Sequence, residues 1–173
     1  MLTDLVQIKR LGGKKEAENK RFSTYLLRYH RRDRRLLRVA EEVESQIDCT
    51  SCANCCREGE AGISNRDIEK LAKFIGVSRE EFRQHYTMRA SDNELILKRT
   101  DEEGCVFLKD NRCSVYEARP KACKLYPHLA DGDGSVASRM FYVKDRVPWC
   151  PIVFNWFEAV KREVEYPPRK GKR

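Results

Sequence analysis

The sequence predicts an α+β fold, in which a long N-terminal helix leads into a small domain with irregular loops that ends in a C-terminal helix. Three observations support this prediction. Apolar residues recur at helical spacing over residues 15–47, and again after Pro151, where a helix is expected to start. Short apolar pieces separated by turns lie between residues 95 and 116. The 173 residues suit one compact domain with an extra helical arm.

The N-terminal arm, residues 1–48, is expected to be helical and basic. Its apolar residues form two strips whose members recur every three or four positions. The strips are Phe22, Leu26 and Tyr29, then Leu36, Ala40, Val43 and Ile47. This spacing predicts either one long helix over residues 15–47 or two helices in line.

Two further helices have recognisable start signals. Ser64 followed by Asp67 resembles a capping box, in which each residue binds the backbone of the other. Gly76 is expected to end that helix, and Ser78 with Glu81 is expected to start a second, shorter one.

Small strands are expected in the rest of the central region. Short apolar pieces at residues 95–97, 105–108 and 113–116 are separated by polar turns. The Asp-Gly-Asp-Gly sequence at residues 131–134 predicts a turn, followed by a strand around residues 138–143.

The charge divides the chain into three segments. The formal net charge is +8. Residues 1–48 carry 12 Lys or Arg against 8 Asp or Glu, residues 49–150 carry 17 against 16, and residues 151–173 carry 6 against 3. We therefore expect a basic helical arm (1–48), a nearly neutral cysteine-bearing domain (49–150), and a C-terminal helix with a basic, mobile tail (151–173).

The sequence gives no sign of a membrane or secretory protein. The first residues contain no apolar run of signal-peptide length, and no stretch approaches the ~20 apolar residues of a membrane span. We expect a cytoplasmic protein in a reducing compartment, where disulfides are rare. Its cysteines therefore need another explanation.

The eight cysteines predict metal binding. They are Cys49, Cys52, Cys55, Cys56, Cys105, Cys113, Cys123 and Cys150. The first four form C-x2-C-x2-C-C, and three cysteines at that step match an iron–sulfur pattern whose last ligand precedes a proline. The pair Cys150-Pro151 fits that last position. Eight ligands divide naturally into two groups of four, although the spacing does not assign the members.

The spacing favours an iron–sulfur cluster, with zinc as the alternative. A four-cysteine zinc site usually has two C-x2-C pairs, whereas Cys105, Cys113 and Cys123 are spaced as single ligands from separate turns. In a four-iron cluster each thiolate binds its own iron, so the ligands stand farther apart than around one zinc ion. We therefore predict a domain whose loops are organised by metal, with a 4Fe-4S cluster favoured.

The same residues resemble a known family. The motif C-x2-C-x2-C-C, the later Cys105-Val-Phe-Leu and Cys113-Ser-Val-Tyr pieces, and Arg119-Pro120-x2-Cys123 followed by Tyr126-Pro127 look like the YkgJ-type cysteine-cluster proteins. The resemblance covers about residues 49–150. It implies a zinc- or iron-chelating CxxCxxCC domain, often described as holding an iron–sulfur cluster, and implies no particular activity.

Three functions are compatible with these residues. The first is an iron–sulfur protein for redox chemistry, sensing or cluster support of a partner. The second is a zinc-stabilised module that docks on RNA, a ribonucleoprotein or an acidic protein through its basic helix. The third is an enzyme or subunit that uses the cluster, although no familiar catalytic motif appears. The candidate partner-binding residues are Arg31, Arg32, Arg34 and Arg35. We expect Arg119 to brace a turn through a salt bridge.

Overall fold

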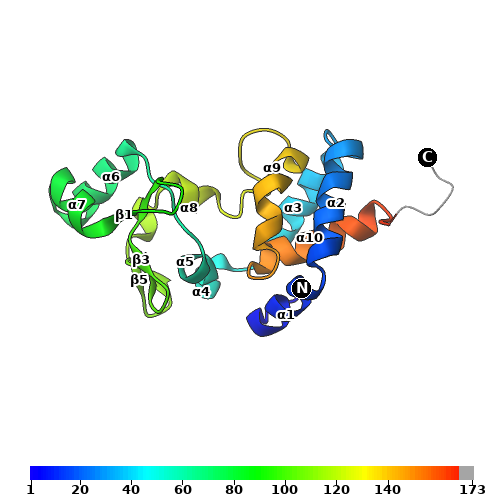
Figure 1. Cartoon of the computed structure of the whole chain (residues 1–173), viewed down its shortest axis with the longest axis horizontal. Coiled ribbons are helices and arrows are strands. Elements are labelled where there is room, and N and C mark those ends of the chain that lie inside the picture. The colour runs from blue at the N-terminus through cyan, green and yellow to red at the C-terminus, as the bar shows by residue number, and fades with distance from the viewer. Residues whose placement is uncertain (168–173) are drawn as a thin grey trace. The chain divides into compact units, whose positions relative to one another are not determined.

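The computed structural model describes residues 1–167, and the chain forms two compact units (Figure 1). Unit 1 combines residues 1–48 with the chain from residue 127 onward, and unit 2 is the segment between them, residues 49–126. The predicted α+β fold, with terminal helices and short strands, is confirmed. The predicted division into a basic arm (1–48), a cysteine-bearing domain (49–150) and a C-terminal helix with a tail (151–173) stays a prediction. Residues 168–173, which include most of the predicted basic tail, lie outside the described residues.

Unit 1 is a group of helices (Figure 1), and its core contains buried aromatic side chains. Its helices are α1 (Leu5–Lys14), α2 (Glu16–Tyr29), α3 (Arg34–Ser45), α9 (Val136–Val143), the 3-10 helix η2 (Lys144–Arg146) and α10 (Pro151–Glu163). Helix α10 packs on α3, and α2 packs on α9. Trp156 is fully buried and donates a hydrogen bond from Nε1 to the Leu36 carbonyl at 3.1 Å. The ring of Phe157 meets that of Phe22 edge-on at 5.8 Å, so α10 contributes much of this core.

The predicted helical region at residues 15–47 is two helices and not one. Helix α2 ends at Tyr29, and α3 begins after Asp33, whose side chain accepts a hydrogen bond from the Arg35 backbone N–H at 2.9 Å. An aspartate that caps a backbone N–H in this way starts a new helix. The cap therefore explains why the helical spacing is interrupted.

The predicted strand at residues 138–143 is wrong, because this segment belongs to helix α9. Ser135 starts the helix by accepting a hydrogen bond from the Ser138 N–H at 3.2 Å. The buried guanidinium of Arg139 donates to carbonyls of the preceding loop. These are the carbonyls of His128, Leu129, Gly132 and Gly134. The cap and these long-side-chain contacts outweigh the strand propensity of a short apolar run.

Unit 2 combines short helices with antiparallel hairpins of two strands each. Its helices are α4 (Cys49–Cys52), α5 (Asn54–Glu58), α6 (Asn65–Ile75), α7 (Arg79–Tyr86), the 3-10 helix η1 (Tyr116–Ala118) and α8 (Lys121–Leu125). The strands pair as β1 (Thr87–Arg89) with β2 (Leu95–Leu97), β3 (Arg99–Thr100) with β4 (Gly104–Cys105), and β5 (Leu108–Lys109) with β6 (Arg112–Cys113). In its core, the rings of Phe82, Tyr86 and Phe107 stack on one another.

The two helices with predicted start signals are confirmed. At the start of α6, the Ser64 hydroxyl accepts from the Asp67 N–H at 3.2 Å, and the Asp67 carboxylate accepts from the Ser64 N–H at 2.9 Å. Gly76 ends this helix in the left-handed conformation. At the start of α7, the Ser78 hydroxyl accepts from the Glu81 N–H at 3.1 Å. Both helix starts are formed by hydrogen bonds between residues three positions apart, as the sequence predicted.

The predicted strand at residues 95–97 is confirmed as β2, whereas the other two are shorter than predicted. The segment 105–108 is divided, because Cys105 ends β4 while Leu108 starts β5. Of the segment 113–116, Cys113 belongs to β6 and Tyr116 already starts η1. Each hairpin therefore turns after two or three residues, and the cysteines lie at the ends of these strands.

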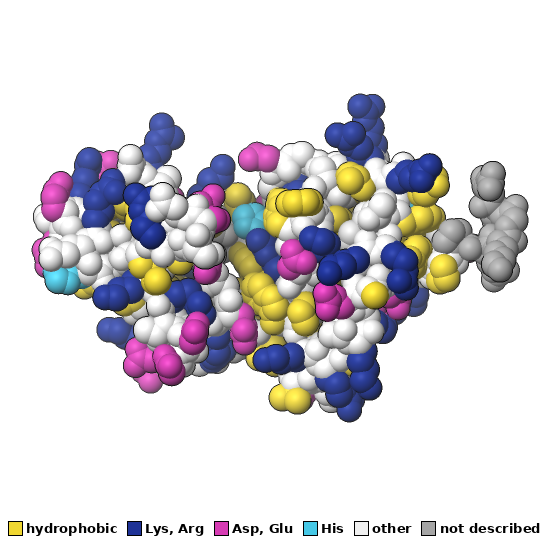
Figure 2. Space-filling model, in the orientation of Figure 1, with side chains coloured by type: hydrophobic (Ala, Val, Ile, Leu, Met, Phe, Trp, Pro, Cys, Tyr) yellow, Lys and Arg dark blue, Asp and Glu magenta, His cyan; other side chains and the backbone are white. Residues whose placement is uncertain are grey.

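Charged side chains cover much of the visible face of both units (Figure 2). This matches the 36% of charged residues in the sequence. Among residues 1–167, no helix combines the length and the apolar character needed to cross a bilayer.

Candidate metal centre

The first cysteine cluster lies on two short helices, α4 and α5. Cys49 and Cys52 are the first and last residues of α4, and Cys55 and Cys56 lie in α5. Between the helices, Ala53 has a left-handed backbone with φ of 48°, which turns the chain. Residues three apart on a helical turn lie on the same side, so the C-x2-C spacing puts Cys49 and Cys52 together as a ligand pair would require.

Gly104 allows the β3–β4 hairpin to lie directly against α5. Its φ is 74°, and a Cβ at this position would come within 2.6 Å of the Cys56 carbonyl oxygen and 3.0 Å of the Arg57 Cα. A left-handed backbone and a collision with main-chain atoms both restrict the position to glycine. This close approach places the next residue, Cys105, beside the helix that carries Cys56.

Cys56, Cys105, Cys113 and Cys123 share one neighbourhood in unit 2, although they come from α5, β4, β6 and α8. Burial raises the pKa of the Cys105 thiol to about 11 and that of the Cys123 thiol to about 12, and neighbouring thiols contribute to both. Burial also raises the pKa of Cys113, with a contribution from Cys56. A metal that binds these thiols must therefore displace protons.

Cys56 differs from the other three thiols. A hydrogen bond from the Cys55 thiol lowers the pKa of Cys56 to about 7, against the effect of burial. The positive charges of Arg57 and Arg119 act in the same direction as the hydrogen bond. Cys56 is therefore substantially ionised at neutral pH, and a thiolate is the form that binds metal.

Arg119 lies next to the thiols and makes no ion pair within residues 1–167. Its Nε donates to the Tyr116 carbonyl at 2.9 Å, and its Cζ lies 3.5 Å from the centroid of the Tyr116 ring. Arg119 thus braces a turn through a carbonyl and a ring, and the expected salt bridge is absent from the described residues. Its charge favours the thiolate forms of Cys56, Cys113 and Cys123.

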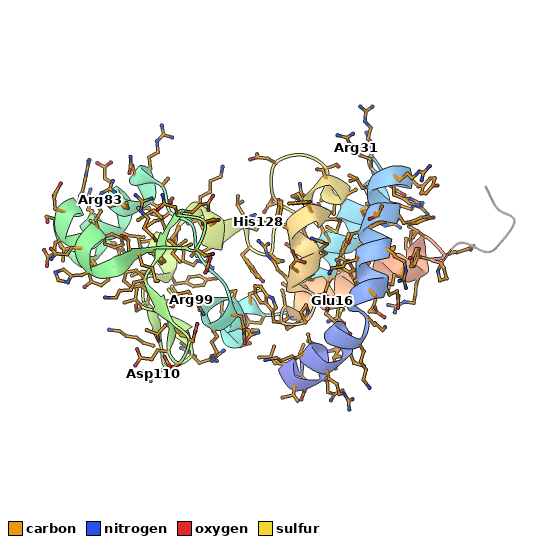
Figure 3. All side chains as sticks on the ribbon, in the orientation of Figure 1. Glu16, Arg31, Arg83, Arg99, Asp110 and His128 are labelled. Carbon is orange, nitrogen blue, oxygen red and sulfur yellow. The ribbon has the colours of Figure 1, made fainter. Side chains whose placement is uncertain are left out.

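The turn between β5 and β6 holds the helix that carries Cys49. Asn111 Nδ2 donates to the Ser51 carbonyl at 2.9 Å, and Arg57 donates both to the Asn111 side chain and, at 3.1 Å, to the Cys52 carbonyl. The neighbouring turn residue, Asp110, is labelled in Figure 3. The sequence predicted a turn here, but not its role, because the contact joins residues about 60 positions apart.

Asp67 links α6 to the helix that carries Cys123. Its carboxylate accepts a hydrogen bond at 3.0 Å from the N–H of Lys121, the first residue of α8. No side chain at Pro120 caps α8, so Asp67 supplies the cap from another helix. Burial raises the pKa of Asp67, but the hydrogen bonds from Ser64 and Lys121 outweigh burial and lower it. The sequence signal at Asp67 predicted only its role in α6.

The remaining predicted site residues belong to unit 1. Cys150 is 4% exposed and directly precedes α10. Its role as a ligand stays a prediction. The four arginines considered for partner binding lie at the turn before α3 and on its first residues, and are Arg31, which is labelled in Figure 3, Arg32, Arg34 and Arg35. Arg35 forms an ion pair with Asp33 at 2.7 Å.

The donor chemistry fits zinc or iron. Both metals take cysteine thiolates, and unit 2 contains every cysteine except Cys150. Within residues 1–167, no three His, Cys, Asp or Glu side chains are arranged to hold a metal ion between them. The assignment of individual cysteines as ligands therefore stays a prediction.

Comparison with known protein families matches residues 48–151 to the CxxCxxCC family, described as "Putative zinc- or iron-chelating domain". The match covers more than half of the chain and includes all eight cysteines. No solved structure matches the chain. The family match confirms the resemblance seen in the cysteine spacing and supports chelation of zinc or iron by cysteines. This chain belongs to the CxxCxxCC family of cysteine-cluster proteins.

Proposed function

We propose that this protein holds an iron–sulfur cluster of the 4Fe-4S type through cysteine thiolates. The observation that carries the proposal is the shared neighbourhood of Cys56, Cys105, Cys113 and Cys123, which come from four separate elements. Ligands from separate elements suit a cluster in which each thiolate binds a different iron. The C-x2-C-x2-C step at residues 49–55 is itself typical of iron–sulfur proteins, but its three cysteines are not among these four ligands.

These four cysteines are the ligands that we propose for the cluster. A bound cluster supplies one-electron transfer, which suits redox chemistry, sensing or the support of a partner's cluster. Arg119 offsets the negative charge of the thiolates, and Asp67 fixes the helix that carries Cys123. Cys49, Cys52 and Cys55 form the rest of the cysteines in unit 2, and we propose that they contribute to a second group of ligands.

Anaerobic purification with metal and sulfide analysis tests the proposal. We expect a brown protein with about four iron and four acid-labile sulfide ions per chain. Its visible absorption should bleach on reduction. A colourless protein with bound zinc and no sulfide would overturn the iron–sulfur proposal while leaving the family's chelating role intact.

A further inference from the structure

The turn between α2 and α3 concentrates positive charge. Residues 28–38 contain six arginines and a single carboxylate, that of Asp33. This carboxylate is occupied within the turn, because it pairs with the Arg35 guanidinium at 2.7 Å and caps α3. Arg38 is also paired, since its Nη2 lies 2.7 Å from the Glu163 carboxylate. Two of the six cations are therefore neutralised by neighbours in unit 1.

Three other arginines of the turn have no such partner. Arg31, Arg32 and Arg34 are exposed, and none of them makes an ion pair in the part of the chain that the structure describes. Figure 3 shows Arg31 extending away from the helices of its unit. Three cations within four residues repel one another, and a polyanion lying against them would relieve that repulsion.

An exposed aromatic ring adjoins these arginines. Tyr29, the last residue of α2, is 62% exposed, and the Arg28 guanidinium lies 5.3 Å from the centroid of its ring. The centroid of the Tyr25 ring lies 5.2 Å from that of the Tyr29 ring, and this contact helps to fix the orientation of Tyr29. An exposed, supported ring beside arginines is the kind of platform on which an unpaired base stacks.

We infer that this turn binds single-stranded nucleic acid. The binding surface, which we name the arginine turn, consists of Arg28, Tyr29, Arg31, Arg32 and Arg34. Phosphates contact the three unpaired guanidinium groups, whose planar fork matches phosphate oxygens better than a lysine ammonium does. A base stacks on Tyr29. An acidic protein would use the same charges but has no need of the exposed ring, so the ring favours nucleic acid. This inference does not depend on which metal the cysteines hold.

Fluorescence anisotropy with the full chain tests the inference. The probe is a fluorescein-labelled single-stranded RNA of twelve adenosines, titrated at 50, 100 and 200 mM salt. The triple variant Arg31→Gln, Arg32→Gln, Arg34→Gln should bind at least tenfold more weakly at 100 mM salt. Its slope of log K against log salt should be shallower by about 2, since three phosphate contacts are lost. The variant Tyr29→Ala should lose about fivefold or more in affinity with an unchanged salt slope.

A second basic surface of unit 1 supplies the matched control. Lys9, Arg10 and Lys14 on α1 are exposed and make no ion pair within residues 1–167, and replacing all three with Gln removes the same charge. We expect this control to weaken binding by less than threefold. An equal loss in the control would mean that total charge, and not the arginine turn, binds RNA, and would overturn the inference. Unchanged affinity of Tyr29→Ala would also overturn the inference. So would an unlabelled poly-glutamate peptide that displaces the labelled RNA as well as unlabelled RNA does, and that result would favour an acidic protein partner. Unchanged metal content in every variant separates these outcomes from the metal proposal.

Discussion

At Cys56, a hydrogen bond from the neighbouring thiol of Cys55 outweighs burial and brings the pKa to about 7. At Cys105 burial outweighs a hydrogen bond from the Phe107 backbone and raises the pKa to about 11, and at Cys123 burial and the charges of neighbouring thiols raise it to about 12. Thiols of one neighbourhood therefore differ in pKa by several units because of their individual contacts. The thiolate is the reactive form, so this difference predicts different chemical reactivity.

We predict that iodoacetamide labels Cys56 well before Cys105 or Cys123 in protein stripped of metal. The fraction of Cys56 thiolate rises as the pH passes through about 7, so its labelling rate should rise with a midpoint near that value, while the other two thiols stay protonated and slow at pH 8. Replacing Arg119 with Gln removes a positive charge and should move the Cys56 midpoint to higher pH. Mass spectrometry of the labelled peptides measures each site, and equal rates for Cys56 and Cys105 at pH 7.5 would contradict the prediction.

Sequence reasoning identified the cysteines but missed the residues that position them. Cysteine spacing is a local pattern, and it predicted the family correctly. Asn111 and Asp67 act on cysteine-bearing helices through contacts with Ser51 and Lys121, each more than 50 residues away in the chain. Such contacts depend on how the hairpins and helices fold together, and no single-sequence pattern encodes them.

At the scale of elements, α2 and α10 are joined by a buried lysine. Lys161 on α10 is 8% exposed at its side chain, and its Nζ donates to Asn19 Oδ1 at 2.7 Å. The same Nζ lies 2.6 Å from the Glu18 carboxylate and 3.1 Å from that of Glu158. Burial raises the pKa of Glu158, but its bonds to Lys15 and Lys161 outweigh burial and lower it. One cation therefore satisfies three acceptors from two helices.

We predict that Lys161→Met lowers the free energy of unfolding by about 2–3 kcal/mol, because it leaves the buried Asn19 oxygen without this donor and removes one of the two cations bonded to Glu158. The control Lys20→Met removes an ion pair to Glu16 whose side chains are 61% and 70% exposed, and should cost about 0.5 kcal/mol or less. Urea unfolding measures both variants. An equal loss of unfolding free energy in the two variants would show that the buried network stabilises the fold no more than an exposed ion pair does.

The same network predicts how the effect of Lys161→Met depends on pH. The pKa of Glu158 is lower in the folded chain than its ordinary value of 4.5, so the folded state binds fewer protons there. The stabilisation is thus fully present above pH 4.5 and is lost as the pH falls through the folded pKa. The difference in unfolding free energy between Lys161→Met and the original chain should be smaller at pH 4 than at pH 7, and a constant difference would contradict this.

The starts of helices were easier to predict from sequence than the secondary structure of a short apolar segment. Ser64 and Ser78 cap helices through residues three positions ahead, so the sequence alone predicted α6 and α7. The segment 138–143 has the composition of a strand, and it is helical because of a cap at Ser135 and the contacts of Arg139. Capping is a local interaction, whereas the choice between helix and strand for a short apolar run depends on tertiary contacts.

At the scale of the whole molecule, unit 2 is an insertion in the chain of unit 1. The chain leaves unit 1 after Asp48 and returns at Pro127, so helices from both ends of the sequence build one core. The hydrogen bond from Trp156 to the Leu36 carbonyl joins residues 120 positions apart in that core. The central cysteine-bearing segment is compact by itself and has its own apolar core around Ile68, Leu71 and Phe107. Unit 1 is thus built from helices of both ends of the chain, and unit 2 carries every cysteine except Cys150.

The metal content of single cysteine variants tests the central claim most directly. The account predicts that Cys→Ala substitution at Cys56, Cys105, Cys113 or Cys123 removes at least half of the bound metal, measured by mass spectrometry of the elements in protein purified without oxygen. Ser91→Ala, an exposed substitution in the same unit, should keep the full content. Circular dichroism checks that each variant keeps its helices. Full metal content in all four cysteine variants would contradict the account, because the metal would then be held elsewhere.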